Sequence, residues 1–96
     1  RKGLKIDAPL YEQLGRALLA HRSYDDAAWA FIAWAVQGGD ALRVQKAVGA
    51  VAAAAASDGA AEQAMRYYDY LLRTYASSQF VDFWKQEIAR LQRARP

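Results

Sequence analysis

Few side chains in this sequence have the chemistry that catalysis or metal binding needs. His21 is the single histidine, cysteine is absent, and the acids nearest to the histidine are Asp25 and Asp26. A histidine beside carboxylates can act as a general base or a metal ligand, but these residues also suit a helix junction, where a cation ends one helix and acids begin the next. Gly38-Gly39 lacks the Lys-Ser/Thr continuation of a phosphate-binding loop. We therefore expect no enzyme, no metal site and no cofactor.

The basic surplus lies at the two ends of the chain. The 96 residues carry 13 lysines and arginines against 10 acids, a net charge of +3. The stretch 6–89 is itself acidic, with seven basic and ten acidic residues, which argues against a strongly basic nucleic-acid module. Binding of nucleic acid or of an anionic membrane surface through the basic ends is the alternative function. The basic residues at the ends are Arg1, Lys2, Lys5, Arg90, Arg93 and Arg95.

Composition and helix punctuation predict an all-α chain. Alanine, leucine, arginine and glutamine favour helix, whereas valine and isoleucine are few. The longest apolar run, 27–36, has ten residues, about half of what a membrane-spanning helix needs. Turn and capping residues separate five expected helices, at about 7–21, 24–37, 40–56, 60–75 and 78–95.

Capping residues are expected at four of the helix starts. Asp7 can cap the first helix and Asp40 the third. Ser23 followed by Asp26 resembles a capping box at the start of the second helix. Ser78 is expected to cap the fifth helix. Because the connecting turns are short, the helices must form antiparallel hairpins.

A spacing of 34 residues links the first and third expected helices. Leu14-Gly15 and Val48-Gly49 lie 34 residues apart, which is the period of tetratricopeptide repeats. The first unit continues at the spacings at which that family places its packing residues, with Tyr11, Leu14, Gly15, Leu18, Ala27, Phe31 and Trp34. The family usually has alanine at the last position, so either Trp34 departs from the pattern or Ala35 takes that role. The sequence thus resembles the tetratricopeptide repeat (TPR) family over residues 8–78.

The resemblance implies a right-handed solenoid of stacked helical hairpins. In the second unit Ala64, Tyr68 and Leu71 come 37 residues after their counterparts, so three residues are inserted near the alanine run. The implied organisation is a lead-in at 1–6, a TPR-like hairpin at 7–37, a second one at 40–76 and a C-terminal capping helix at 78–95.

Small residues are expected where the helices cross. Gly15 and Gly49 lie mid-helix, where glycine costs about 1 kcal/mol against alanine, so each is expected to admit a close neighbouring helix. The alanines at 52–56 would pack close to an adjacent helix or leave room for a ligand. The expected packing residues are Leu14, Gly15, Ala27, Phe31, Gly49, Ala64 and Tyr68.

The resemblance also implies a binding groove, because the first helix of each TPR hairpin lines the concave side. This lining would be mildly basic over an apolar floor, which suits an amphipathic helix or an extended peptide with acidic residues. It differs from the carboxylate-clamp subset of the family, which needs lysine and asparagine where this chain has Glu12 and Arg16. The implied groove residues are Glu12, Arg16, Leu19, Ala20, Arg43, Lys46, Ala47 and Ala50.

Other aromatic residues form a second candidate interface. Tyr67 and Tyr70 are expected either to lie exposed beside arginines, as at many protein interfaces, or to stack within the domain. The last helix has more apolar surface than one hairpin needs, which indicates self-association or a further hairpin. Its register is open between Phe80 and Val81 as the first inward position. The interface candidates are Trp29, Tyr67, Tyr70, Phe83 and Trp84.

On this resemblance we expect a non-catalytic adaptor or scaffold domain that binds another protein. The alanine- and arginine-rich composition suggests a bacterial source, and residues 67–80 resemble repeats of envelope-assembly and secretion lipoproteins. The sequence begins at Arg1 without methionine, so we expect a piece of a longer or processed product. Its expected place is the cytoplasmic or periplasmic face of a bacterial membrane-associated complex.

Overall fold

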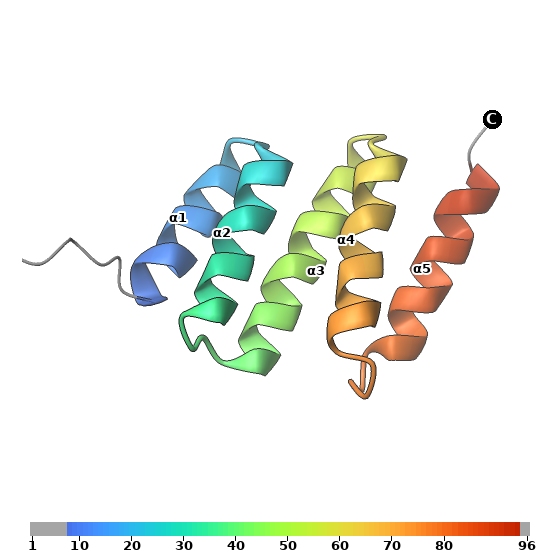
Figure 1. The fold of residues 1–96 in the computed structure, drawn as a ribbon. Helices are drawn as coiled ribbons and strands as arrows, with labels where there is room; N and C mark the ends of the chain where they lie inside the picture. The colour runs from blue at the N-terminus through green and yellow to red at the C-terminus, as the bar shows by residue number, and fades with distance from the viewer. Residues whose placement is uncertain (1–7, 95–96) are drawn as a thin grey trace, which may run out of the picture.

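Five α-helices lie side by side in the computed structural model, which describes residues 8–94 (Figure 1). Each helix packs against the one before it, so the molecule is an elongated row with principal extents of 54, 30 and 15 Å. The prediction of an all-α fold with five helices is confirmed. The helices are α1 (Ala8–Ala20), α2 (Tyr24–Val36), α3 (Ala41–Ser57), α4 (Ala61–Thr74) and α5 (Val81–Ala94).

The centre of the core is formed by α2, which packs against α1 and α3 and also touches α4. Apolar residues extend round most of this helix, and such a helix is stable only when it is covered on several sides. Ala27 and Ala30 are fully buried, and Phe31 retains 2% of its surface exposed. Burial of an aromatic side chain of this size stabilises a fold by about 1.5–3 kcal/mol. The apolar run at 27–36 therefore contributes one side of α2 to the core, while Trp29 and Val36 remain exposed.

The alanine run makes α3 the longest helix. It has 17 residues against 13 in α1, and the four extra residues add about one turn. Ala52 and Ala55 are fully buried, so their small side chains bring α3 close to its neighbours. The expectation of close helix packing along this run is confirmed at these two residues.

The two mid-helix glycines have different surroundings. A Cβ atom placed on Gly15 would lie 2.6 Å from the Phe31 ring, which confirms the expected close approach of α1 and α2. A Cβ atom placed on Gly49 would meet no atom within 4 Å, so the close approach expected there is wrong. An unpredicted close contact lies at Gly39, whose Cβ would be 2.5 Å from Nε1 of Trp34.

Three of the four predicted capping residues, Ser23, Asp40 and Ser78, lie in the described range. The carboxylate of Asp40 accepts a hydrogen bond of 2.9 Å from the backbone N–H of Arg43, as predicted for α3. Ser23 precedes α2, but its side chain makes no capping hydrogen bond, so the predicted capping box is wrong. Its ψ of 76° is far from the extended conformation in which such a side chain reaches the first turn. Asp7 lies outside the described residues.

Helix α5 begins three residues later than predicted. The hydroxyl of Ser78 accepts a hydrogen bond of 3.0 Å from the backbone N–H of Phe80, and the helix starts at Val81. Phe80 and Val81 both pack against the core, followed by the buried Trp84 and Leu91. Phe80 precedes the helix, so within α5 the inward face starts at Val81.

Candidate functional site

A hollow of about 330 Å³ lies between α1 and α3, with α2 as its floor. We call it the basic hollow. It gathers seven of the eight groove residues that the resemblance implied, and it adds Phe31 and Trp34 of α2. Ala20, the eighth, borders a neighbouring hollow instead. The lining residues are Glu12, Arg16, Leu19, Phe31, Trp34, Arg43, Lys46, Ala47 and Ala50.

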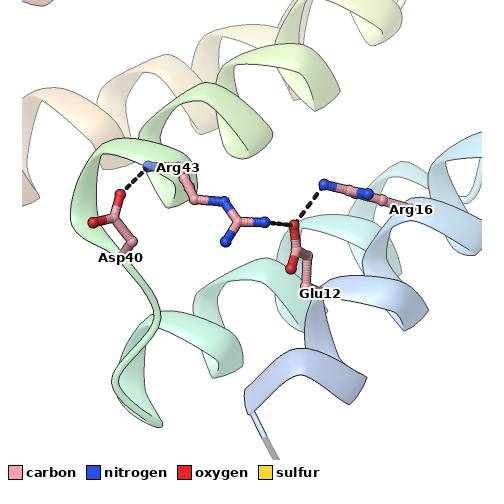
Figure 2. A network of polar contacts seen from close by, with 4 residues as sticks. All are labelled: Glu12, Arg16, Asp40 and Arg43. Carbon is pink, nitrogen blue, oxygen red and sulfur yellow. Dashed lines mark hydrogen bonds and ion pairs between the residues drawn. The ribbon is translucent and has the colours of Figure 1, made fainter.

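One carboxylate joins the two arginines of the basic hollow (Figure 2). Oε2 of Glu12 accepts a hydrogen bond of 2.5 Å from Arg16 on its own helix and one of 2.6 Å from Arg43 on α3. The Glu12 side chain is only 13% exposed, whereas those of Arg16 and Arg43 are 68% and 58% exposed. Glu12 therefore positions both guanidinium groups toward solvent, where they remain accessible to another carboxylate.

Positive charge is in excess at the basic hollow. Glu12 balances one of the two guanidinium charges, and Lys46 adds an exposed ammonium group. The ion pairs recorded between described residues leave Lys46 without a partner. Two positive charges are thus available to an anionic partner.

Arg43 is held in place by its local surroundings. Its backbone N–H is bound by Asp40, as Figure 2 shows, and its guanidinium carbon lies 5.4 Å from the centre of the Trp34 ring. A cation over an indole face is attracted to the ring. Trp34 is itself buried, with 4% of its surface exposed, and packs at 6.3 Å from Phe31 between ring centres. Because Arg43 is restrained before any partner arrives, less side-chain entropy is lost on binding.

A second hollow of about 260 Å³ lies between α3 and α5, with Tyr68 of α4 on its floor. We call it the apolar hollow. Sequence reasoning missed it, although it named six of its lining residues individually for other roles. Lys46 borders both hollows, so the two are contiguous. The lining residues are Gln45, Lys46, Gly49, Ala53, Tyr68, Phe80, Phe83 and Trp84.

The second set of interface candidates divides into exposed and buried residues. Trp29 is 56% and Phe83 52% exposed, and Tyr70 is half-buried. Tyr67 and Trp84 are buried, with 7% and 2% of their surfaces exposed. For Tyr67 the exposed alternative is therefore wrong, and Trp84 lies inward as both registers of the last helix required. The spacing 64, 67, 68 and 71 is itself the pattern of a buried helix face, and this signal would have placed Tyr67 inward.

The hydroxyl of Tyr67 ties α4 to α2. It donates a hydrogen bond to the carboxylate of Asp25, and this bond holds the pKa of Asp25 below its usual value. Burial of the phenol, together with the neighbouring carboxylate, raises the pKa of Tyr67. The two residues are 42 positions apart, and the sequence carries no signal for such a pair.

A similar tie joins the first hairpin to the end of α3. Asp58 accepts hydrogen bonds from the hydroxyl of Tyr24 and, at 2.6 Å, from Arg22. Both lower the pKa of Asp58, the tyrosine more than the arginine. Arg22 adopts the left-handed conformation, with a φ of 62°. These contacts lie away from the basic hollow and serve to hold the hairpins together.

The acidic side chains and the histidine are the candidate metal ligands among the described residues. Within residues 8–94, no group of three or more His, Cys, Asp or Glu residues could hold a metal ion, and His21 is exposed in the turn after α1. Of the five helices described, none is long and apolar enough to cross a membrane.

Comparisons with protein-family models, with curated proteins and with solved structures give no match.

Proposed function

We propose that this chain is a non-catalytic protein-binding domain of TPR-like hairpins, and that it takes an acidic segment of a partner into the basic hollow. One observation carries the proposal. Side chains from α1 and α3, about 30 positions apart in the sequence, form one hollow with surplus positive charge over an aromatic floor. A surface of this kind suits an acidic peptide because charge and apolar contact act on the same segment.

The TPR-like part of the proposal is supported by three features. The 34-residue spacing, the contact of Gly15 with Phe31, and the shared hollow of α1 and α3 all fit hairpins stacked side by side. In such an arrangement the first helix of each hairpin lines the binding side. On this proposal α1 and α3 line the binding side.

The chemistry of recognition follows from the exposed cations. A partner carboxylate near Lys46 meets an ammonium group that has no ion pair recorded among the described residues. The exposed guanidinium edges of Arg16 and Arg43 lie across the same hollow. Aliphatic parts of the partner can contact Leu19 and the rings of α2. Exposed charge pairs contribute little individually, about 0.2–1 kcal/mol each, so the expected affinity is modest and falls with salt.

A direct test uses two pools of fluorescein-labelled peptides. The Glu pool carries a fixed pair of glutamates in a randomised background, and the Gln pool carries glutamines at the same two positions. Fluorescence anisotropy should show tighter binding of the Glu pool to the wild type, and the advantage should disappear in Arg43→Glu/Lys46→Glu. Equal binding of both pools to the wild type would refute recognition of acidic segments.

Binding through the basic ends of the chain is the alternative function. Arg90, one of these basic residues, is engaged by Glu87 at 2.6 Å. The same anisotropy assay with a labelled DNA duplex, and cosedimentation with anionic vesicles, distinguishes this alternative. Tight binding that falls steeply with salt would favour it.

A further inference from the structure

Gly49 is a glycine for which the fold shows no packing requirement. It lies in the middle of α3, where glycine weakens a helix relative to alanine. A Cβ atom at this position would meet nothing within 4 Å, in contrast to Gly15, where the Phe31 ring leaves no space. Gly49 instead borders the apolar hollow, so the missing side chain keeps that hollow open.

The apolar hollow has the size and surface of a pocket for one ring. Tyr68 and Trp84 are almost fully buried, at 1% and 2% exposure, whereas Phe83 stands 52% exposed at the edge. Phe83 packs edge-on against Tyr68, with ring centres 6.4 Å apart. A cavity of about 150 Å³ is enough for a benzene ring, and this hollow has about 260 Å³.

The side-chain oxygen of the buried Gln45, which lines the hollow, already has a partner. Oε1 of Gln45 accepts a hydrogen bond of 2.5 Å from the hydroxyl of Ser78. Among the described residues, no buried side-chain nitrogen or oxygen lacks a partner. The hollow therefore presents aromatic and methyl surface to a ligand, and it favours an apolar side chain over a polar one.

We infer that the apolar hollow takes an aromatic or long aliphatic side chain of the same partner segment whose acidic residues bind at the basic hollow. The inference rests on the proposed function and deepens it. Lys46 borders both hollows, so an acidic residue bound by its ammonium group leaves the adjoining part of the segment at the mouth of the apolar hollow. The recognised partner is thus an acidic segment with an apolar anchor, and the charge excess around Lys46 supplies the complementarity.

The test adds two peptide pools and three protein variants, one of which is a control. The Glu-Phe pool places a phenylalanine at each position near the glutamate pair in turn, and the Glu-Ser pool places serine at the same positions. Gly49→Leu fills the hollow from inside α3, and Gly49→Ala fills it partly. Ala41→Leu adds the same side chain at an exposed position of α3 outside both hollows and serves as the control.

We expect the wild type and Ala41→Leu to bind the Glu-Phe pool about tenfold more tightly than the Glu-Ser pool, because burying an aromatic side chain is favourable. Gly49→Leu should lose this advantage while binding the Glu-Ser pool like the wild type. Helical circular dichroism and a thermal melt establish that each variant is folded, and Gly49→Ala is expected to melt no lower than the wild type.

The possible failures are distinguishable. If the Glu-Ser pool binds the wild type and phenylalanine gives no advantage, the apolar anchor is refuted and the acidic-segment proposal stands. If the advantage persists in Gly49→Leu, the anchor binds elsewhere and this inference is also refuted. If neither pool binds the wild type, both proposals fail together.

Discussion

Gly15 and Gly49 lie 34 residues apart, each in the middle of a helix, but have different surroundings. The first is pressed against a buried ring, and the second faces open space. Identical substitutions at the two sites therefore separate packing from helix propensity. Because both glycines lie in α-helices, any difference between the two substitutions comes from the atoms around each residue.

The first prediction compares Gly15→Ala with Gly49→Ala. At Gly15 the new methyl group would lie 2.6 Å from the Phe31 ring, so we expect a loss of about 1 kcal/mol or more in the free energy of unfolding. At Gly49 alanine should raise that free energy by about 0.5–1 kcal/mol. Urea denaturation of both variants measures the difference, and a change of the same sign at both sites would contradict this packing.

The second prediction concerns the left-handed backbone of Arg22. A non-glycine residue with a φ of 62° pays a steric cost that glycine avoids, of about 1–2 kcal/mol. Arg22→Gly and Arg22→Ala both lose the ion pair with Asp58, so they differ only in the backbone. We expect the glycine variant to be more stable than the alanine variant by about 1 kcal/mol in urea denaturation. Equal stability would show that this turn is not left-handed in solution.

At the scale of elements, α2 and α4 are joined by the bond between Tyr67 and Asp25. The lowered pKa of Asp25 means that the folded protein holds this carboxylate ionised more strongly than the unfolded chain does. Its contribution is complete above about pH 4, the ordinary value of the group, and is lost as the pH falls through the folded-state pKa. The pKa of Tyr67 is raised in the folded protein, so folding favours the neutral phenol. This contribution to stability is complete below about pH 10, where the unfolded chain begins to ionise, and is lost as the pH rises further.

The third prediction is that Tyr67→Phe weakens the fold and flattens both ends of its pH profile. Loss of one hydrogen bond should cost about 1 kcal/mol at neutral pH. Thermal melts across the pH range should then show smaller losses of stability in acid and in alkali than for the wild type. Tyr11→Phe is the matched control, because no hydrogen bond of its hydroxyl is recorded among the described residues and its half-buried ring packs edge-on against Trp29. If the pH profile of Tyr67→Phe matched that of the wild type, the hydrogen bond between Tyr67 and Asp25 would be ruled out.

The sequence predicts where the helices lie along the chain better than it predicts which face each helix turns toward its neighbours. Caps such as Asp40 and periodic apolar residues are local signals, and they place all five helices within a few residues. The partners of Tyr67 and Tyr24 depend on how each helix turns about its own axis, which long-range packing decides. The 34-residue spacing led to the prediction of a groove lined by α1 and α3, whereas the apolar hollow depends on α5, for which this spacing offers no counterpart in the sequence.

For the whole molecule, the elongated row determines where stability is concentrated. Helices α2, α3 and α4 each pack against neighbours on two sides, while α1 packs mainly on α2 and α5 mainly on α4. Stability in such an arrangement depends on contacts between nearest neighbours. The middle helices should therefore be the last to open.

The fourth prediction is a gradient of amide hydrogen exchange along the row. Protection should be greatest in α2, α3 and α4 and lower in α1 and α5, because the end helices can detach without exposing the central core. Exchange measured by mass spectrometry after proteolysis resolves the five helices. Uniform protection from α1 to α5 would mean that the row unfolds as a single cooperative unit.

The account as a whole depends on the positive charge shared by the two hollows, and reversal of Lys46 tests it most directly. Lys46→Glu changes an exposed side chain with no recorded ion pair, so the fold should be unaffected. Lys85→Glu makes the same charge change on α5 outside both hollows. In a titration with the Glu pool at low salt, we expect Lys46→Glu to bind about tenfold more weakly than the wild type, and Lys85→Glu to bind like the wild type. Equal affinity of the two variants for the Glu pool would contradict the central claim.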